Sequence, residues 1–224
     1  MSNSSLVEYT KLSPNNSGER TAKIDRITPH CVAGQCTAEG LGEWFAKSST
    51  QASSNYGIDQ VGRVGMYVPE NCRSWCSSSS SNDKRAVTIE CASDTAEPYT
   101  MNKEVYNTLV KLCVDICERN GKTALLWISD KDKALAYQPA EHEMLLTVHR
   151  WFANKSCPGE WLFSRLGTLA ETVTKQLTPA EAPTPTTIYR VQVGAYKIKS
   201  NADKMLERIR AAGFPDAFIT TVQK

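Results

Sequence analysis

Long apolar runs, an excess of charge of one sign and an export signal are all missing from this sequence of 224 residues. No stretch approaches the roughly 20 apolar residues that a membrane-spanning helix needs, so we expect no membrane partner. The 26 Lys and Arg nearly balance the 24 Asp and Glu, which is too balanced to support a nucleic-acid-binding protein. The first ten residues contain neither the basic nor the apolar segment of a secretory signal peptide, which predicts a chain made in the cytoplasm.

Cysteine is present eight times, but these residues are diluted over the whole chain, so we do not expect a disulfide scaffold. Cys113 and Cys117 lie one helical turn apart in an apolar pattern and are predicted to be small buried hydrophobes. Cys72 and Cys76 flank Trp75 in a polar stretch, and their spacing permits a local disulfide. A structural zinc site built from these CxxxC pairs is a weaker alternative, because zinc ribbons more often separate their cysteines by two residues.

The clearest division of the chain is a Pro/Thr-rich segment at 178–187, which predicts an extended linker. It separates a body, residues 1–177, from a tail, residues 188–224. The tail contains seven Lys and Arg against three Asp and Glu, a net charge of +4, so the rest of the chain is left with −2. The tail is therefore the basic part of the protein.

The tail has the pattern of a small β-α-β unit. Alternating apolar residues from Tyr189 to Val193 predict a strand, and helical spacing over 201–212 predicts a helix that Gly213 ends. Residues 217–222 predict a second strand. Two strands and one helix bury too little apolar surface to be stable alone.

The body has the pattern of a mixed α/β domain, with a central mixed β-sheet flanked by helices. The most regular helix is expected over 102–120, where apolar residues follow one face and Asn120-Gly121 stops the helix. The predicted strands are 25–30, 54–58, 65–68, 86–90 and 125–128, and the other predicted helices are 37–45 and 159–177.

Histidine is scarce, and two of the three histidines lie where they could bind a metal. His30 ends a predicted strand, and His149 precedes Cys157 by eight residues. Two neutral imidazoles and a thiolate form a normal ligand set for Zn²⁺, and three protein ligands leave the fourth tetrahedral position open, as a catalytic zinc requires. The spacing alone is also consistent with isolated histidines and with a cysteine that packs against Pro158.

Four stretches in the body make the sequence similar to a known family. They are Ile27-Thr-Pro-His-Cys-Val-Ala-Gly-Gln, Ser54-Asn-Tyr-Gly-Ile, Arg85-Ala-Val-Thr-Ile-Glu, and Val148-His-Arg-Trp-Phe through Lys155-Ser-Cys-Pro-Gly. In this order, across about residues 20–175, they resemble the zinc-dependent N-acetylmuramoyl-L-alanine amidases of the type 2 family, and most of all the phage endolysin branch. This family includes T7 lysozyme and the peptidoglycan recognition proteins.

The resemblance implies a role for particular residues. His30, His149 and Cys157 match the zinc ligands, Glu90 matches the glutamate that deprotonates the zinc-bound water, and Lys155 matches the lysine beside the developing oxyanion. The other residues implied at the site are Tyr56, which matches a tyrosine lining the same centre, and Trp75, Asn82 and Asp83, which we expect beside the cleft as contacts to glycan or stem peptide.

The function implied is hydrolysis of the amide bond between N-acetylmuramic acid and the L-alanine of the stem peptide. Two alternatives share the scaffold. One is a non-catalytic peptidoglycan-recognition protein, although such members typically lose a metal ligand. The other is a host autolysin with the same chemistry. For an endolysin, we expect release from the cytoplasm to the wall when the membrane is breached.

The tail also has a likeness. Ile188-Tyr-Arg-Val-Gln-Val-Gly-Ala-Tyr, a helix and then Gly213-Phe214 with a strand resemble the first half of a SPOR domain, a module that binds peptidoglycan glycan strands. Since a full domain has two β-α-β halves, two tails could pair and rebuild the sheet, which predicts a homodimer. A truncated SPOR domain is the alternative.

Overall fold

The computed structural model describes residues 2–177 and 191–222, and the chain divides into two units, Met1–Pro179 and Ala180–Lys224. In the first unit, seven strands form one sheet with the order β1-β5-β4-β7-β3-β9-β8. Its strands are β1 (Val7–Thr10), β3 (Arg26–Cys31), β4 (Tyr56–Ile58), β5 (Val64–Met66), β7 (Ala86–Cys91), β8 (Ala124–Leu126) and β9 (Glu143–Leu146). β4 and β5 are antiparallel and the other neighbours are parallel, so the sheet is mixed, as predicted. A separate two-stranded ribbon pairs β2 (Asn16–Glu19) with β6 (Cys72–Ser74).

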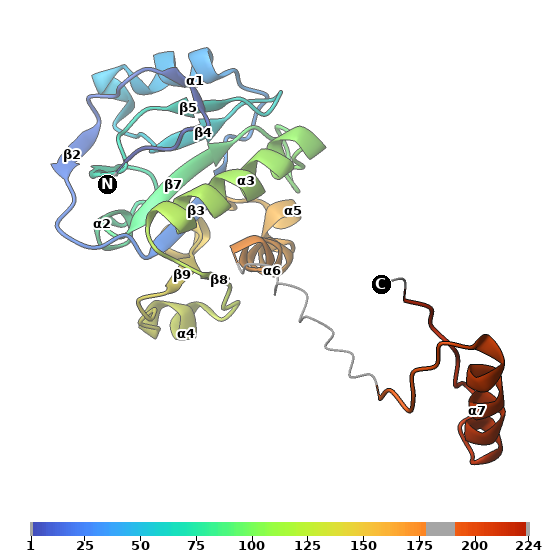
Figure 1. Cartoon of the computed structure of the whole chain (residues 1–224). Helices are drawn as coiled ribbons and strands as arrows, with labels where there is room; N and C mark the ends of the chain where they lie inside the picture. Colours follow the sequence, from blue (N-terminus) through green and yellow to red (C-terminus); the bar gives the residue numbers. More distant parts are fainter. Residues whose placement is uncertain (1, 178–190, 223–224) are drawn as a thin grey trace. The chain divides into compact units, whose positions relative to one another are not determined.

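The helices of this unit surround the sheet (Figure 1). They are α1 (Ala38–Phe45), α2 (Ser80–Asp83), α3 (Lys103–Arg119), α4 (Lys131–Ala136), α5 (Glu160–Phe163) and α6 (Leu166–Leu177), with short 3₁₀ turns η1 (Ser48–Thr50) and η2 (His149–Trp151). The helix predicted over 159–177 is two helices, because a bond from Arg165 N–H to Leu162 O interrupts the α-helical ladder between them. Within the described residues, no helix is both long and apolar enough to span a membrane.

Local sequence explains why α3 is the most regular helix. The Asn102 side chain accepts a bond from Val105 N–H and so caps the helix start. The apolar stripe of α3 is buried, and Gly121 follows the end of the helix with a φ of +67°. The predicted bounds of 102–120 are thus confirmed to within one residue.

The two faces of the sheet differ. Along paired parallel strands, residues opposite one another point to the same face. Ile27, Ile89 and Tyr56 belong to the apolar cluster beneath α3. His30 and Glu90 are one residue out of phase with this set and face the other side, where α1 packs. Gly57 marks that side, since a Cβ there would lie 2.6 Å from Leu41 Cδ2 of α1.

The second unit is described over residues 191–222 and contains one helix, α7 (Lys199–Ala211), near the predicted position. The two strands predicted for the tail are wrong within these residues, where neither flank of the helix is a strand. An extended segment needs a neighbouring strand to bond its backbone, and neither flank has one here. Their apolar side chains are accordingly exposed, with Val191 at 89 % and Val222 at 84 %.

Candidate metal centre and catalytic site

The centre of the site is formed by two adjacent parallel strands. His30 on β3 lies directly opposite Glu90 on β7 in the strand register, and both side chains point to the face opposite α3. His30 Nδ1 is 3.9 Å from Glu90 Oε1. The pairing of β3 with β7 therefore brings together two residues that are sixty positions apart in the sequence.

His149 and Cys157 approach His30 from the segment that follows β9. The rings of His30 and His149 have centroids 5.0 Å apart, and Cys157 Sγ lies 3.3 Å from His30 Nδ1. A bond from Arg150 N–H to Cys157 O, at 3.1 Å, closes the loop between them. One donor atom from each of His30, His149 and Cys157 lies within 4.8 Å of the others, so these three residues can hold a metal ion.

Unpartnered polar atoms support a metal at this place. Among the described residues, His30 Nε2 and Glu90 Oε2 are buried without a hydrogen-bond partner. Buried polar groups nearly always have one, because an unsatisfied group costs about 1–3 kcal/mol. Two imidazoles and a thiol are also a donor set that suits a first-row transition metal. The residues present therefore fit a metal ion.

Burial sets the charge state of these groups. It lowers the pKa of His30 to about 3, helped by the neighbouring His149. The pKa of His149 is lowered by burial and then by the Lys155 ammonium. Both imidazoles are therefore neutral at pH 7, which is the form that binds metals. Burial raises the pKa of Glu90 to about 8, partly offset by a bond from the Cys76 thiol. A carboxyl group whose pKa lies near neutral pH is well suited to accept and release protons.

One wall of the site is the loop 75–79, between β6 and α2. Ser78 Oγ lies 3.0 Å from His149 Nε2, and the Cys76 thiol donates to Glu90 Oε1 at 3.7 Å. A bond from Nε2–H to Ser78 would leave His149 Nδ1 free as a ligand. Sequence spacing tied Cys76 only to Cys72, and both are free thiols in this structure, so no local signal linked it to Glu90.

Asn82 and Asp83 hold this loop and do not border a cleft. Asn82 is 0 % and Asp83 2 % exposed, so the prediction that they contact substrate is wrong. Asp83 accepts bonds from Cys76 N–H at 3.0 Å and from the Ser77 hydroxyl at 2.5 Å. The Asn82 amide donates to Thr28 Oγ1 at 3.0 Å. Their polarity suggested surface residues, but short side chains can also satisfy buried backbone groups.

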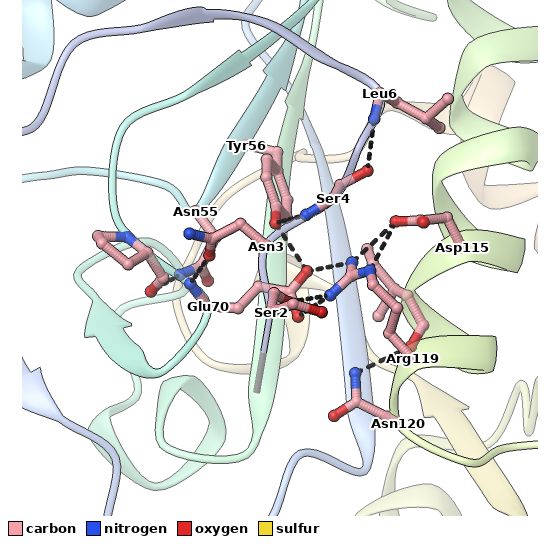
Figure 2. A network of polar contacts seen from close by, with 12 residues as sticks. Ser2, Asn3, Ser4, Leu6, Asn55, Tyr56, Glu70, Asp115, Arg119 and Asn120 are labelled. Atoms are coloured by element: carbon pink, nitrogen blue, oxygen red, sulfur yellow. Dashed lines mark hydrogen bonds and ion pairs between the residues drawn. The ribbon is translucent and has the colours of Figure 1, made fainter.

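Tyr56 is likewise not at the centre, and its predicted place there is wrong. It pairs with Ile89 in register, so it points to the α3 face, and its side chain is fully buried. Its hydroxyl donates to Glu70 Oε1 at 2.7 Å and accepts from Ser4 N–H at 2.9 Å (Figure 2). Glu70 is in turn paired with Arg119 of α3. Strand alternation, which a motif match does not reveal, places Tyr56 in this structural network.

Lys155 and Trp75 lie at accessible positions. Lys155 is exposed and lines a groove of about 680 Å³ together with Arg150, Glu97 and Glu160. The positive charge of its ammonium contributes to the lowered pKa of His149. Trp75 is the half-buried first residue of the loop 75–79, and its indole N–H donates to Ser17 Oγ at 2.7 Å.

Comparison with known families matches residues 20–160 to the family described as N-acetylmuramoyl-L-alanine amidase and residues 174–224 to the SPOR domain. Among solved structures, the chain is similar to PlyL, with 17 % identity over 74 % of this chain and 95 % of that chain and a TM-score of 0.51.

Two further structures are similar. The hydrolase AmiA of Staphylococcus aureus, in complex with its ligand, shares 11 % identity over 75 % of this chain and 82 % of its own, with a TM-score of 0.52. The N-acetylmuramoyl-L-alanine amidase LysC from Clostridium intestinale URNW shares 15 % identity over 71 % of this chain and 91 % of its own, with a TM-score of 0.50. At these identities the likeness concerns the fold. No curated protein matches the chain.

Proposed function

Because the chain belongs to the N-acetylmuramoyl-L-alanine amidase family and is an amidase of that kind, we propose that it is a zinc-dependent endolysin. It would cleave the bond between N-acetylmuramic acid and the L-alanine of the stem peptide in bacterial peptidoglycan. The observation that carries the proposal is the cluster of His30, His149 and Cys157, whose donor atoms lie within 4.8 Å of one another beside Glu90.

Zinc is the metal that best suits this donor set. Two neutral imidazoles and one thiolate leave one tetrahedral position for the reaction, whereas a structural zinc site usually has four protein ligands. When bound, zinc acidifies water to a pKa of about 7 and polarises a carbonyl oxygen. His30 and His149 are already neutral, so they need lose no proton to act as ligands.

Glu90 and Lys155 supply the remaining chemistry. Glu90 lies 3.9 Å from His30, and its raised pKa suits it to take a proton from the attacking water and to return it to the leaving amine. Lys155 carries a positive charge at the groove, where negative charge would develop on the carbonyl oxygen. One such donor contributes about 3–4 kcal/mol to the transition state.

The SPOR domain implies that the tail binds peptidoglycan, which would keep the amidase at the wall and raise its effective concentration there. The endolysin assignment rests on the motifs that resemble the phage branch, and it predicts action on the wall after release from the cytoplasm. A host autolysin would perform the same reaction. A neighbouring holin-like gene would support the endolysin, whereas wall-synthesis neighbours would favour the autolysin.

We also propose that two copies pair through the tail. The apolar side chains of residues 191–198 and 214–222 are exposed, and a second copy would give these flanks a partner for their backbone bonds. Sedimentation velocity at micromolar concentration should show a dimer, and Val193→Glu should convert it to a monomer. A wild-type monomer would contradict the proposal.

Mass spectrometry of products from purified peptidoglycan tests the proposed reaction. The zinc-loaded protein should release free stem peptides that begin at L-alanine and leave the glycan strands intact. His149→Ala should release none, whereas His142→Ala, which changes an exposed histidine outside the cluster, should act like wild type. Fragments that still carry sugar would show that a different bond is cut, and no release from several wall types would contradict the proposal.

A further inference from the structure

His30 belongs to two sets of donor atoms. The first is the cluster with His149 and Cys157. The second joins His30 to Cys76 and Glu90, and its three donor atoms also lie within 4.8 Å of one another. Cys76 Sγ is 3.7 Å from Glu90 Oε1, and Glu90 Oε1 is 3.9 Å from His30 Nδ1. The second set thus contains a thiol that the proposed function does not use.

The spacing of this second set suits a single metal ion. With metal–ligand bonds of about 2.0–2.3 Å, two tetrahedral zinc ligands lie roughly 3.5 Å apart. The two separations in the second set exceed this value by only a few tenths of an ångström, which small side-chain rotations can supply. These separations are to Glu90 Oε1 and His30 Nδ1, and the second carboxylate oxygen, Glu90 Oε2, is buried without a partner among the described residues.

Cys76 is held in this position by the fold. Its backbone N–H donates to Asp83 Oδ2 at 3.0 Å, and Trp75 N–H donates to Ser53 Oγ at 3.0 Å. Asp83 is itself buried. The thiol is therefore presented to Glu90 by a loop that buried side chains anchor, in contrast to a cysteine on a free surface loop.

We propose that Cys76 is a second thiolate ligand of this centre, binding the metal together with His30 and Glu90 in exchange with His149 and Cys157. The inference rests on the proposed function only in that the centre binds a metal. On binding, the Cys76 thiol releases its proton to solvent and the sulfur lone pair forms the metal bond, with no change of oxidation state. While Glu90 is a ligand it is not available to accept a proton, so this arrangement is a resting state.

Cobalt substitution tests the assignment without measuring activity. Sulfur-to-cobalt charge-transfer absorbance in the near ultraviolet depends on the number of bound thiolates. Each arrangement has one thiolate, so Cys157→Ser should keep a sulfur-to-cobalt band through Cys76, whereas the double variant Cys76→Ser/Cys157→Ser should have none. Cys72→Ser is the matched control, because it changes a free thiol on the same segment outside the donor sets, and it should leave the band unchanged.

A Cys157→Ser protein with no band at all would overturn the inference. So would a Cys76→Ser/Cys157→Ser protein that keeps the band. Circular dichroism of the metal-free variants checks folding. If Cys157→Ser does not fold, Cys157→Ala tests the same point, and the absence of a band from it would refute the proposal. A Cys157→Ser protein without a band, beside a wild-type protein that releases stem peptides, would refute this inference alone. A wild-type protein that neither binds metal nor releases stem peptides would refute the proposed function.

Discussion

Glu70 and Glu90 are both largely buried against the central sheet, on opposite faces, but their oxygens have very different partners. Glu70 accepts bonds from the Tyr56 hydroxyl and from the Arg119 guanidinium, which Asp115 also holds (Figure 2). Glu90 accepts one long bond from the Cys76 thiol, and its other oxygen has no partner among the described residues. A satisfied buried carboxylate holds the fold together, whereas an unsatisfied one retains capacity for a metal or a proton.

Among substitutions that distinguish the two faces of the sheet, His30→Ala should have the largest effect, because it removes the residue shared by both donor sets. We expect the loss of bound metal and a fall in kcat/KM of more than about a thousandfold, because the metal supplies several kcal/mol of transition-state stabilisation. Metal analysis and stem-peptide release measure this. Retention of zinc with near-normal activity would contradict the assigned site.

Glu90→Gln should leave the metal in place and still lower kcat by about 10²–10⁴-fold, because the amide cannot accept a proton. Stem-peptide release at saturating substrate measures kcat, and metal analysis is the control. An equal loss of metal and activity would show that Glu90 acts mainly as a ligand.

Glu70→Gln should behave in the opposite way and reduce stability rather than chemistry. Breaking a buried ion pair costs about 3–5 kcal/mol, and the lower end is expected because Arg119 keeps its pair with Asp115. Urea unfolding measures the loss, and activity per folded molecule should stay near wild type. A specific loss of activity at unchanged stability would place Glu70 in the catalytic machinery.

The metal-free protein should lose stability as the pH rises from 6.5 to 8. Burial raises the pKa of Glu90 to about 8, above its usual 4.5, so in this window the native state keeps a proton that the unfolded state has released. The expected loss is about 2 kcal/mol. The lowered pKa of His30, about 3, acts only below pH 6.5, where it makes stability rise with pH. In thermal unfolding experiments, the metal-free Glu90→Gln protein should not lose stability above pH 6.5. If it still does, a group other than Glu90 causes the loss.

The smallest expected effect is that of Tyr56→Phe. It removes the bond to Glu70 and leaves Ser4 N–H without its acceptor, at a cost of about 1–2 kcal/mol. Activity should not change, since the side chain faces α3. A large fall in kcat at wild-type stability would restore Tyr56 to the site.

Much of the fold was predictable because it depends on local patterns. The cap at Asn102, the apolar stripe and Gly121 define α3, and the Pro/Thr-rich segment at 178–187 was expected to divide body from tail. The helix α7 was also expected from its spacing. The strands of the tail could not be predicted reliably, because a strand requires a hydrogen-bonding partner that local sequence does not reveal.

The sequence itself determined the residue types that an amidase needs. These are two histidines, a cysteine, a glutamate and a lysine in family order. Only the tertiary structure decided which side chains meet. The register of β3 and β7 places His30 beside Glu90, and the register of β4 and β7 turns Tyr56 away. Burial makes Asn82 and Asp83 anchors of the loop that carries Cys76 to Glu90. The side of the sheet to which a strand residue points and the partners of a buried polar group both depend on segments that are distant in the chain. Local spacing in the sequence does not encode these contacts.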